Sequence, residues 1–371
     1  MHTYQHLGAY SDLVDAARAQ RTLWPVAAPG LETQQRFRES LGFCNKPEVA
    51  YDIRIDDEWQ RDGIAGQALS WSVGYGPRTE AWLLKPAGAS APLPGILALH
   101  DHGGFKFYGK EKIADGPQGE ARGTHNFRQE SYGDRAYANA LAREGYVVLV
   151  HDTFLWGSRR FPIEVMRLAV GTQPNDTAES DFPPEIAAYN RTAGRHEHTV
   201  SKYCNLLGTS IAGVVCFEDR VATNVLASRK DVLPDRIGCI GLSGGGNRAA
   251  MLLATHEAIK AAAIIGLMST YEELLDKDMS HTWMLFPFNW SQHGDWPDVA
   301  ACRAPMPLLV QYDTEDELFT PKGMLDAHER IAMHYRQAGR PDAYAGVFYP
   351  GPHKFDLQMQ VDAFRWLGEK L

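Results

Sequence analysis

A serine set among glycines, in the run 241–245 (GLSGG), constrains the fold of this chain more than any other feature. Residues 236–240 before it form a short apolar run that predicts a buried strand, and residues 247–254 after it are typical of a helix. A sharp turn from strand to helix puts its central residue in strained backbone geometry, which requires small neighbours. We therefore predict a nucleophile elbow that exposes the Ser243 hydroxyl at the end of a sheet.

Apolar runs alternate with helical patterns along most of the chain. Buried strands are predicted at 95–100, 146–150, 236–240, 261–265, 307–312 and 345–349, and helices at 137–143, 211–228, 247–254, around 324–335 and at 355–370. This alternation predicts an α/β fold with a mostly parallel sheet, helices on both faces and ligands at the strand carboxyl ends. Residues 51–55, 67–75 and 80–84 predict antiparallel strands at a sheet edge.

Two segments lie outside this alternation. Residues 1–48 predict a helical extension whose apolar face includes Leu13 and Phe37, and this extension either packs on the main domain or serves as an oligomer contact. Residues 157–205 are rich in proline and show no strand pattern, so we expect a cap-like insertion of loops and short helices over the strand ends. We predict a single domain over 1–371, and whether it forms a homo-oligomer stays open.

Composition excludes several classes of function. The formal net charge of −9 leaves no basic surplus for a nucleic-acid partner. No apolar run reaches the roughly 18 residues that a membrane span needs, and the N-terminus shows no secretory signal pattern. The five cysteines are Cys44, Cys204, Cys216, Cys239 and Cys302. Their scatter favours free thiols in a reducing compartment, so we expect a cytoplasmic protein without membrane partners.

An activated serine needs a base, and the base needs a carboxylate that orients it. His353 follows the last predicted strand in a Gly-Pro loop, and we predict that it is the base. The acid should follow the strand 307–312, where Asp316 is our first choice and Asp313 the alternative. Glu315 and Glu317, which flank Asp316, are interpreted as solvated.

The reaction also needs an oxyanion hole made of backbone N–H groups. The residue after the nucleophile, Gly244, should supply one donor. The second donor should come from the loop 100–104 (HDHGG), where His102 is favoured over Gly103.

Other polar clusters are given structural interpretations. His100, Asp101 and His102, together with 196–198 (HEH), could suggest a metal site, but we expect neither a metal nor any cofactor. Asp152 is interpreted as a buried structural carboxylate. A further set of basic residues is interpreted as solvated: Lys106, Lys110, Lys112, Arg159 and Arg160. The aromatic-rich segment 283–296 could equally line a pocket or pack in the core.

Several of these motifs occur together in one known superfamily. The loop 100–104, the run 150–152 (VHD), the elbow, 304–309 (APMPLL) with Asp316, and 350–353 (PGPH) follow the order of the α/β-hydrolase superfamily. Over about residues 50–371 the chain resembles its dienelactone-hydrolase-like and acetyl-xylan-esterase-like branch. The resemblance implies a triad of Ser243, Asp316 and His353 that hydrolyses carboxylic esters through an acyl-enzyme.

The chain departs from that branch at two points. Its oxyanion loop reads His-Asp-His-Gly where His-Gly-x is usual, and its nucleophile is serine where dienelactone hydrolases have cysteine. We expect a serine carboxylesterase that removes a small acyl group, such as acetyl, from a sugar or another alcohol. The alternatives are a peptidase of the prolyl-oligopeptidase type, a lyase acting on carbon–carbon bonds, and a binding protein without catalysis.

Overall fold

The structure, a computed structural model, describes residues 3–42, 46–177, 180–276 and 279–371, so Cys44 lies outside the described residues. The strands are β1 (Tyr51–Arg61), β2 (Ile64–Ser72), β3 (Thr79–Pro86), β4 (Leu93–Leu99), β5 (Val147–His151), β6 (Val232–Leu242), β7 (Ile259–Ile265), β8 (Leu308–Asp313) and β9 (Tyr344–Tyr349). The α-helices are α1 (Asp12–Gln20), α2 (Leu31–Leu41), α3 (His125–Tyr132), α4 (Tyr137–Arg143), α5 (Ile163–Val170), α6 (Pro184–Leu206), α7 (Ile211–Ala227), α8 (Gly244–Thr255), α9 (Tyr271–Leu274), α10 (Trp296–Ala301), α11 (Pro321–Gln337) and α12 (Leu357–Lys370).

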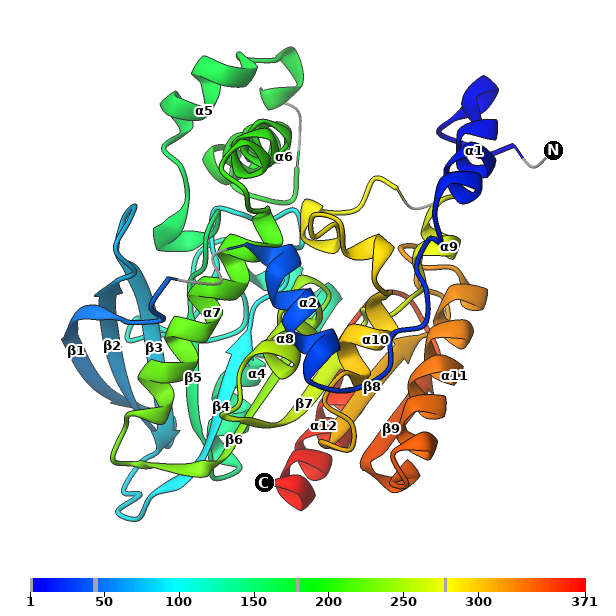
Figure 1. Cartoon of the computed structure of the whole chain (residues 1–371). Helices are drawn as coiled ribbons and strands as arrows, with labels where there is room; N and C mark the ends of the chain where they lie inside the picture. The colour runs from blue at the N-terminus through cyan, green and yellow to red at the C-terminus, as the bar shows by residue number, and fades with distance from the viewer. Residues whose placement is uncertain (1–2, 43–45, 178–179, 277–278) are drawn as a thin grey trace.

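The described strands form one sheet in the order β1-β2-β3-β5-β4-β6-β7-β8-β9. From β5 through β9 each neighbouring pair is parallel, whereas β1, β2 and β3 are antiparallel to their neighbours and form one edge. This confirms the predicted mostly parallel sheet with an antiparallel edge, and Figure 1 shows its twist. The first strand is longer than predicted, and β2 lies three residues earlier than the predicted 67–75, because the two strands pair as a hairpin through the turn at Asp62 and Gly63, both of which have positive φ.

Alternate residues of the central strands pack against two separate layers of helices. In β4, Leu97 and Leu99 belong to the apolar cluster that includes residues of α7, α8 and α10. Ile96 and Ala98 belong to the cluster on the other face, with residues of α4 and α12. Side chains of a strand point alternately to the two faces, and a fully buried aliphatic side chain contributes about 1.5–3 kcal/mol. The helices therefore cover both faces, as predicted.

The N-terminal extension is only partly helical. α1 and α2 confirm two helical segments, but residues 21–30 between them are not helical, because two prolines and Gly30 interrupt the pattern. Phe37 is buried and meets the Trp290 ring edge-on at 5.1 Å. Leu13, predicted on the apolar face, is 58% exposed, so that part of the prediction is wrong.

The insertion 157–205 contains a longer helix than predicted. α6 has 23 residues and begins at Pro184, the second of two consecutive prolines. A proline in the first helical turn lacks only an N–H that would be unpaired there, so it starts the helix instead of breaking it. In Figure 1, α5 and α6 stand beyond one end of the sheet. No single described helix is long and apolar enough to cross a membrane; α6 and α7 pass such a test only as a pair, bent by 82°.

Candidate active site

Ser243 lies on the turn between β6 and α8. Its backbone has φ 56° and ψ −120°, a conformation that L residues rarely adopt. Such geometry costs about 1–3 kcal/mol and persists only where the surroundings impose it. Here the Ser243 N–H donates to the Ile265 carbonyl at the end of β7, at 2.8 Å, and the Ser243 carbonyl accepts from Asn247 in the first turn of α8.

The glycines around Ser243 are required by close backbone contacts. A Cβ on Gly241 would lie 2.5 Å from the carbonyl carbon of Gly245 and 2.6 Å from the Leu99 carbonyl oxygen. A Cβ on Gly245 would lie 2.2 Å from the same oxygen of Leu99. Strand β6, helix α8 and the end of β4 thus approach so closely at this turn that no side chain fits at either position.

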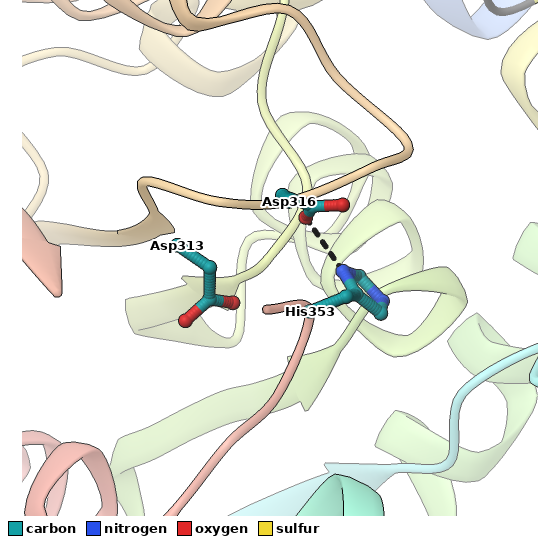
Figure 2. A group of neighbouring side chains, drawn as sticks. All are labelled: Asp313, Asp316 and His353. Carbon is teal, nitrogen blue, oxygen red and sulfur yellow. Dashed lines mark hydrogen bonds and ion pairs between the residues drawn. The ribbon is translucent and has the colours of Figure 1, made fainter. Parts of the chain in front are cut away.

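His353 and Asp316 are hydrogen-bonded to each other. Nδ1 of His353, in the loop after β9, lies 2.6 Å from Oδ2 of Asp316, in the loop after β8 (Figure 2). Desolvation lowers the pKa of His353, but the hydrogen bond and charge of Asp316, together with the charges of Asp313 and Asp101, outweigh it and raise that pKa above its ordinary value. Nε2 of His353 is buried and has no hydrogen-bond partner within the described part of the chain. A general base needs such a free nitrogen.

Asp313, the alternative acid, has different contacts. Its Oδ2 accepts the Lys354 N–H at 3.1 Å, and its Oδ1 has no partner among the described residues. Figure 2 shows the Asp313 carboxylate standing apart from the bonded pair of Asp316 and His353. Desolvation raises the pKa of Asp313 to about 7, with a further rise from the charge of Asp316 that the Lys354 N–H and His353 only partly offset.

Ser243 and His353 face one cavity of about 290 Å³. Its lining consists of residues 101–104, Phe127, Ser131, Leu242, Ser243, residues 280–282, Leu318 and His353. Ser243 and His353 are also linked through the end of β7. The Ile265 carbonyl accepts the Ser243 N–H, and the next residue, Gly266, lies so close to the His353 ring that an added Cβ would be 3.1 Å from Cε1. The structure therefore brings the predicted nucleophile and base together. No described residue of 157–205 lines this cavity.

The two predicted oxyanion donors are also neighbours. Gly244 is the first residue of α8, where backbone N–H groups have no partner within the helix and carry the positive end of its dipole. A Cβ on Gly244 would lie 2.6 Å from the backbone nitrogen of His102. Gly103 and Gly104 both have positive φ, so the loop turns sharply just after His102. An anionic oxygen next to Ser243 would thus meet N–H groups from two segments.

The lysines near this loop are not solvated, which corrects the sequence interpretation. Lys112 is fully buried, and its Nζ lies 2.9 Å from Oδ2 of Asp101. The other oxygen of Asp101, Oδ1, accepts a hydrogen bond from the Tyr132 hydroxyl at 2.5 Å. Lys110 pairs with the buried Asp152 at 2.9 Å, so Asp152 is a structural carboxylate, as interpreted.

The remaining basic residues of that set also have partners in the protein. Lys106 pairs with Glu197 of α6. Arg159 pairs with Glu218 at 2.5 Å, and Arg160 lies over the Phe107 ring at 4.3 Å. Sequence reasoning missed the ion pairs of Lys106 and Arg159 because their carboxylate partners lie 91 and 59 residues away along the chain. Glu315 and Glu317, in contrast, are exposed as interpreted.

The histidines of the predicted metal alternative have other partners. His100 is buried with Nδ1 at 3.0 Å from the Asp101 carbonyl, and His102 Nε2 lies 2.9 Å from Glu197. Among the described residues, the His, Cys, Asp and Glu side chains close enough to share a metal ion are Asp313, Asp316 and His353, with ligand atoms within 4.8 Å of one another. Within that group, Nδ1 of His353 is already held by Asp316.

The aromatic segment is mostly core. Trp290 and Trp296 are buried and both meet the Phe37 ring edge-on, at 5.1 and 6.1 Å. Phe288 is exposed, and Trp283 donates from Nε1 to His198 at 3.0 Å. Of the two alternatives left open for this segment, core packing holds for Trp290 and Trp296.

Comparison with known proteins finds relatives of low identity. A Bacillus subtilis protein named as a hydrolase candidate, YtaP, is 23% identical over 324 residues, which cover 87% of this chain and 92% of the relative. Among solved structures, a candidate acetyl xylan esterase from Bacteroides fragilis matches with a TM-score of 0.67 at 18% identity, over 91% of this chain and 82% of that one.

Two further solved structures match over nearly their whole length. A glucuronoyl esterase from Solibacter usitatus has a TM-score of 0.59 at 15% identity, over 94% of this chain and 98% of its own. Acetyl Xylan Esterase 1 from Thermoanaerobacterium has a TM-score of 0.56 at 14% identity, over 95% of this chain and 98% of its own. No protein-family model matches the chain. At these identities the structural likeness establishes the fold and not the reaction.

Proposed function

We propose that this chain, which has the α/β-hydrolase fold, is a serine carboxylesterase. The observation that carries the proposal is the strained Ser243 facing the same cavity as His353, whose buried Nε2 has no partner among the described residues and whose Nδ1 is held by Asp316. The structural neighbours named as esterases support the same class of reaction.

The proposed mechanism uses protein groups alone. His353 Nε2 takes the Oγ proton of Ser243 while Oγ attacks the ester carbonyl carbon. The carbonyl oxygen becomes an oxyanion that accepts hydrogen bonds from the N–H groups of Gly244 and His102. Asp316 keeps the imidazole in the tautomer with its proton on Nδ1 and stabilises the imidazolium.

The tetrahedral intermediate then collapses. His353 gives its proton to the departing alcohol oxygen, and the acyl group stays on Ser243. A water molecule loses a proton to His353 and attacks the acyl carbon. His353 returns the proton to Oγ as the carboxylic acid leaves, so the enzyme is regenerated without a cofactor.

The cavity indicates a small, uncharged acyl group. Its volume of about 290 Å³ lies at the lower end of the range for ligand sites. None of the described residues that line it is lysine or arginine, so a carboxylate on the acyl side would find no ion pair there. Ser280, an exposed residue of this lining, offers a hydroxyl group to the leaving alcohol. We propose a small acyl ester, such as an acetyl ester, of a sugar or another alcohol.

We also propose a cytoplasmic location. The four cysteines within the described residues are buried free thiols. Thiols that pack as small apolar side chains suit a reducing compartment.

The proposal is tested with p-nitrophenyl esters of increasing acyl length. Wild type should prefer the acetyl ester, and Ser243→Ala and His353→Ala should each lose about 10⁴- to 10⁶-fold in kcat. Activity that survives in Ser243→Ala would refute the mechanism. A parallel panel of peptide amides separates an esterase from a peptidase, since hydrolysis of the amides in preference to the esters would overturn the assignment.

A further inference from the structure

The carboxylate of Glu197 joins three segments around the candidate active site. Glu197 belongs to α6, and only 6% of the residue is exposed. Its Oε2 lies 2.9 Å from Nε2 of His102 and also accepts the Lys106 ammonium. Its Oε1 accepts the Thr282 hydroxyl at 3.0 Å and the Trp283 N–H at 3.3 Å. Four donors match the roughly four lone-pair sites of an ionised carboxylate.

Glu197 is ionised in this setting. Burial raises the pKa of Glu197, but the His102 ring and the Lys106 ammonium lower it by more, so this pKa lies below its ordinary value. An ionised carboxylate can only accept hydrogen bonds, and bonds to it are stronger than those between neutral groups. Every donor around Glu197 is therefore held firmly toward it.

The hydrogen bonds of His102 fix which ring nitrogen carries the proton. The Gly104 N–H donates to Nδ1 of His102 at 3.1 Å. A neutral imidazole has one N–H, so the proton lies on Nε2, which then donates to Glu197. The ring is thus bonded on one side to its own backbone turn and on the other to α6. Trp156 adds a third contact, because its Nε1 donates to the His102 carbonyl at 3.3 Å.

The ring contacts bear directly on the backbone next to Ser243. Because the Gly104 N–H is bound to the ring of His102, the ring orientation and the turn 102–104 are set together. The backbone nitrogen of His102 lies beside Gly244, where it can act as the second oxyanion donor. A displaced ring would therefore displace that donor.

We propose that Glu197 is a positioning residue for the oxyanion hole. Through the His102 ring it holds the turn that directs the His102 N–H toward the oxyanion formed on Ser243. The insertion 157–205 thus contributes to the reaction although its described residues do not line the cavity. This inference rests on the proposed esterase function and assigns a role to a residue outside the triad.

Glu197→Gln is the most direct perturbation because it keeps the shape and removes the charge. A glutamine has one acceptor oxygen, whereas Glu197 accepts donors on both oxygens. If the amide oxygen stays with Thr282, the amide NH₂ faces Nε2–H of His102 and the Lys106 ammonium. His102 must then rotate or move its proton to Nδ1, where the Gly104 N–H already donates.

Glu218→Gln is the matched control. Glu218 is 1% exposed and likewise accepts from several donors, including Arg159 and the Phe154 N–H. Its described hydrogen bonds reach no residue of the loop 100–104. Both variants lose one buried charge, so both should lose thermal stability, and only Glu197→Gln should lose catalysis.

The readout is kinetic and specific to the oxyanion. Complete removal of an oxyanion donor costs about 10²- to 10³-fold in kcat, so a misplaced donor should cost about 10- to 100-fold. We expect this loss in the kcat of Glu197→Gln for p-nitrophenyl acetate, with KM changed less than about threefold. Glu218→Gln should keep the wild-type kcat.

A trifluoromethyl ketone tests the same point without turnover. Ser243 adds to its carbonyl, the Oγ proton passes to His353, and the resulting oxyanion occupies the hole. Its inhibition constant should rise about 10- to 100-fold in Glu197→Gln, in parallel with kcat. Equal constants in Glu197→Gln and Glu218→Gln would overturn the proposed role.

Failure of this inference can be told from failure of the proposed function. An active wild type with an unimpaired Glu197→Gln refutes only the positioning role, whereas a wild type inactive on every ester refutes both. The NMR signal of the His102 Nε2–H proton reports the contact between His102 and Glu197 independently of any activity measurement. This signal is identified by its absence in His102→Ala. The signal should move in Glu197→Gln and stay in place in Glu218→Gln.

A second variant covers the case in which Glu197→Gln does not fold. His102→Ala keeps the pairing of Glu197 with Lys106 and deletes the ring that carries the proposed effect. It should by itself lower kcat about 10- to 100-fold and weaken the trifluoromethyl ketone. Wild-type values in His102→Ala would overturn the inference.

Discussion

Asp316→Asn should lower kcat for p-nitrophenyl acetate by about 10³- to 10⁴-fold. Asp316 uses both oxygens, since Oδ1 accepts the Leu318 N–H at 2.8 Å and Oδ2 bonds to His353 at 2.6 Å. An asparagine that keeps its oxygen on Leu318 turns its NH₂ toward Nδ1 of His353. Nδ1 must then accept, the ring proton moves to Nε2, and no lone pair remains to take the proton of Ser243.

This loss corresponds to about 4–5.5 kcal/mol of transition-state stabilisation. It should fall on kcat with KM nearly unchanged, because the tautomer matters only when the Ser243 proton moves. Asp313→Asn is the matched control, since its described contacts are with Lys354, and it should lose less than about tenfold. A larger loss in Asp313→Asn than in Asp316→Asn would refute the assignment of the acid.

Three further predictions concern the elbow and the charges beside the base. Gly245→Ala would place a Cβ 2.2 Å from the Leu99 carbonyl oxygen and should lower the free energy of unfolding, measured by thermal unfolding, by about 1–3 kcal/mol. The control Gly194→Ala, whose Cβ meets nothing within 4 Å, should leave stability unchanged or raise it, and equal effects of the two variants would contradict the steric argument. Because the effect of Asp316 outweighs the desolvation of His353 and raises its pKa, kcat/KM should increase with pH along a titration curve whose midpoint lies above 6.5. A midpoint below 6.5 would show that desolvation outweighs the effect of Asp316. Burial raises the pKa of Asp313 from 3.8 to about 7. Between about pH 4 and pH 7 the folded state therefore keeps a proton that the unfolded chain releases, so this carboxyl lowers the free energy of unfolding as the pH rises through that range. Asp313→Asn should therefore raise Tm by a few degrees at pH 8 and by less at pH 5, and an equal shift at both would count against a protonated Asp313.

Local patterns predicted the elements that carry the site. The apolar strand, the GLSGG turn and the following helix are all short-range features, and the structure shows the same strand, turn and helix around Ser243. His353 follows the final strand at a position that sequence order defines. Sequence alone leaves the choice between Asp313 and Asp316 open because Asp313 ends β8 and Asp316 lies only three residues after it, so that tertiary contacts decide between them.

The rest depended on contacts that sequence patterns do not encode. Lys106 is hydrophilic and was interpreted as solvated, yet its carboxylate partner Glu197 is 91 residues away. Burial of such a pair follows from how α6 packs on the loop after β4, and no periodicity near either residue reveals it. α6 itself was predicted as short helices because prolines usually interrupt a helix, whereas here Pro184 starts one.

Labelling by a fluorophosphonate tests the central claim most directly. In the full chain, the Ser243 oxygen should attack the phosphorus of the reagent and displace fluoride. The chain should then carry one phosphonyl group on that oxygen, located by peptide mass spectrometry. Ser243→Ala should take up no label, and His353→Ala should react far more slowly, because nothing then removes the Oγ proton. A wild-type chain that hydrolyses esters while Ser243 stays unmodified, or that is labelled at another residue, would contradict the account.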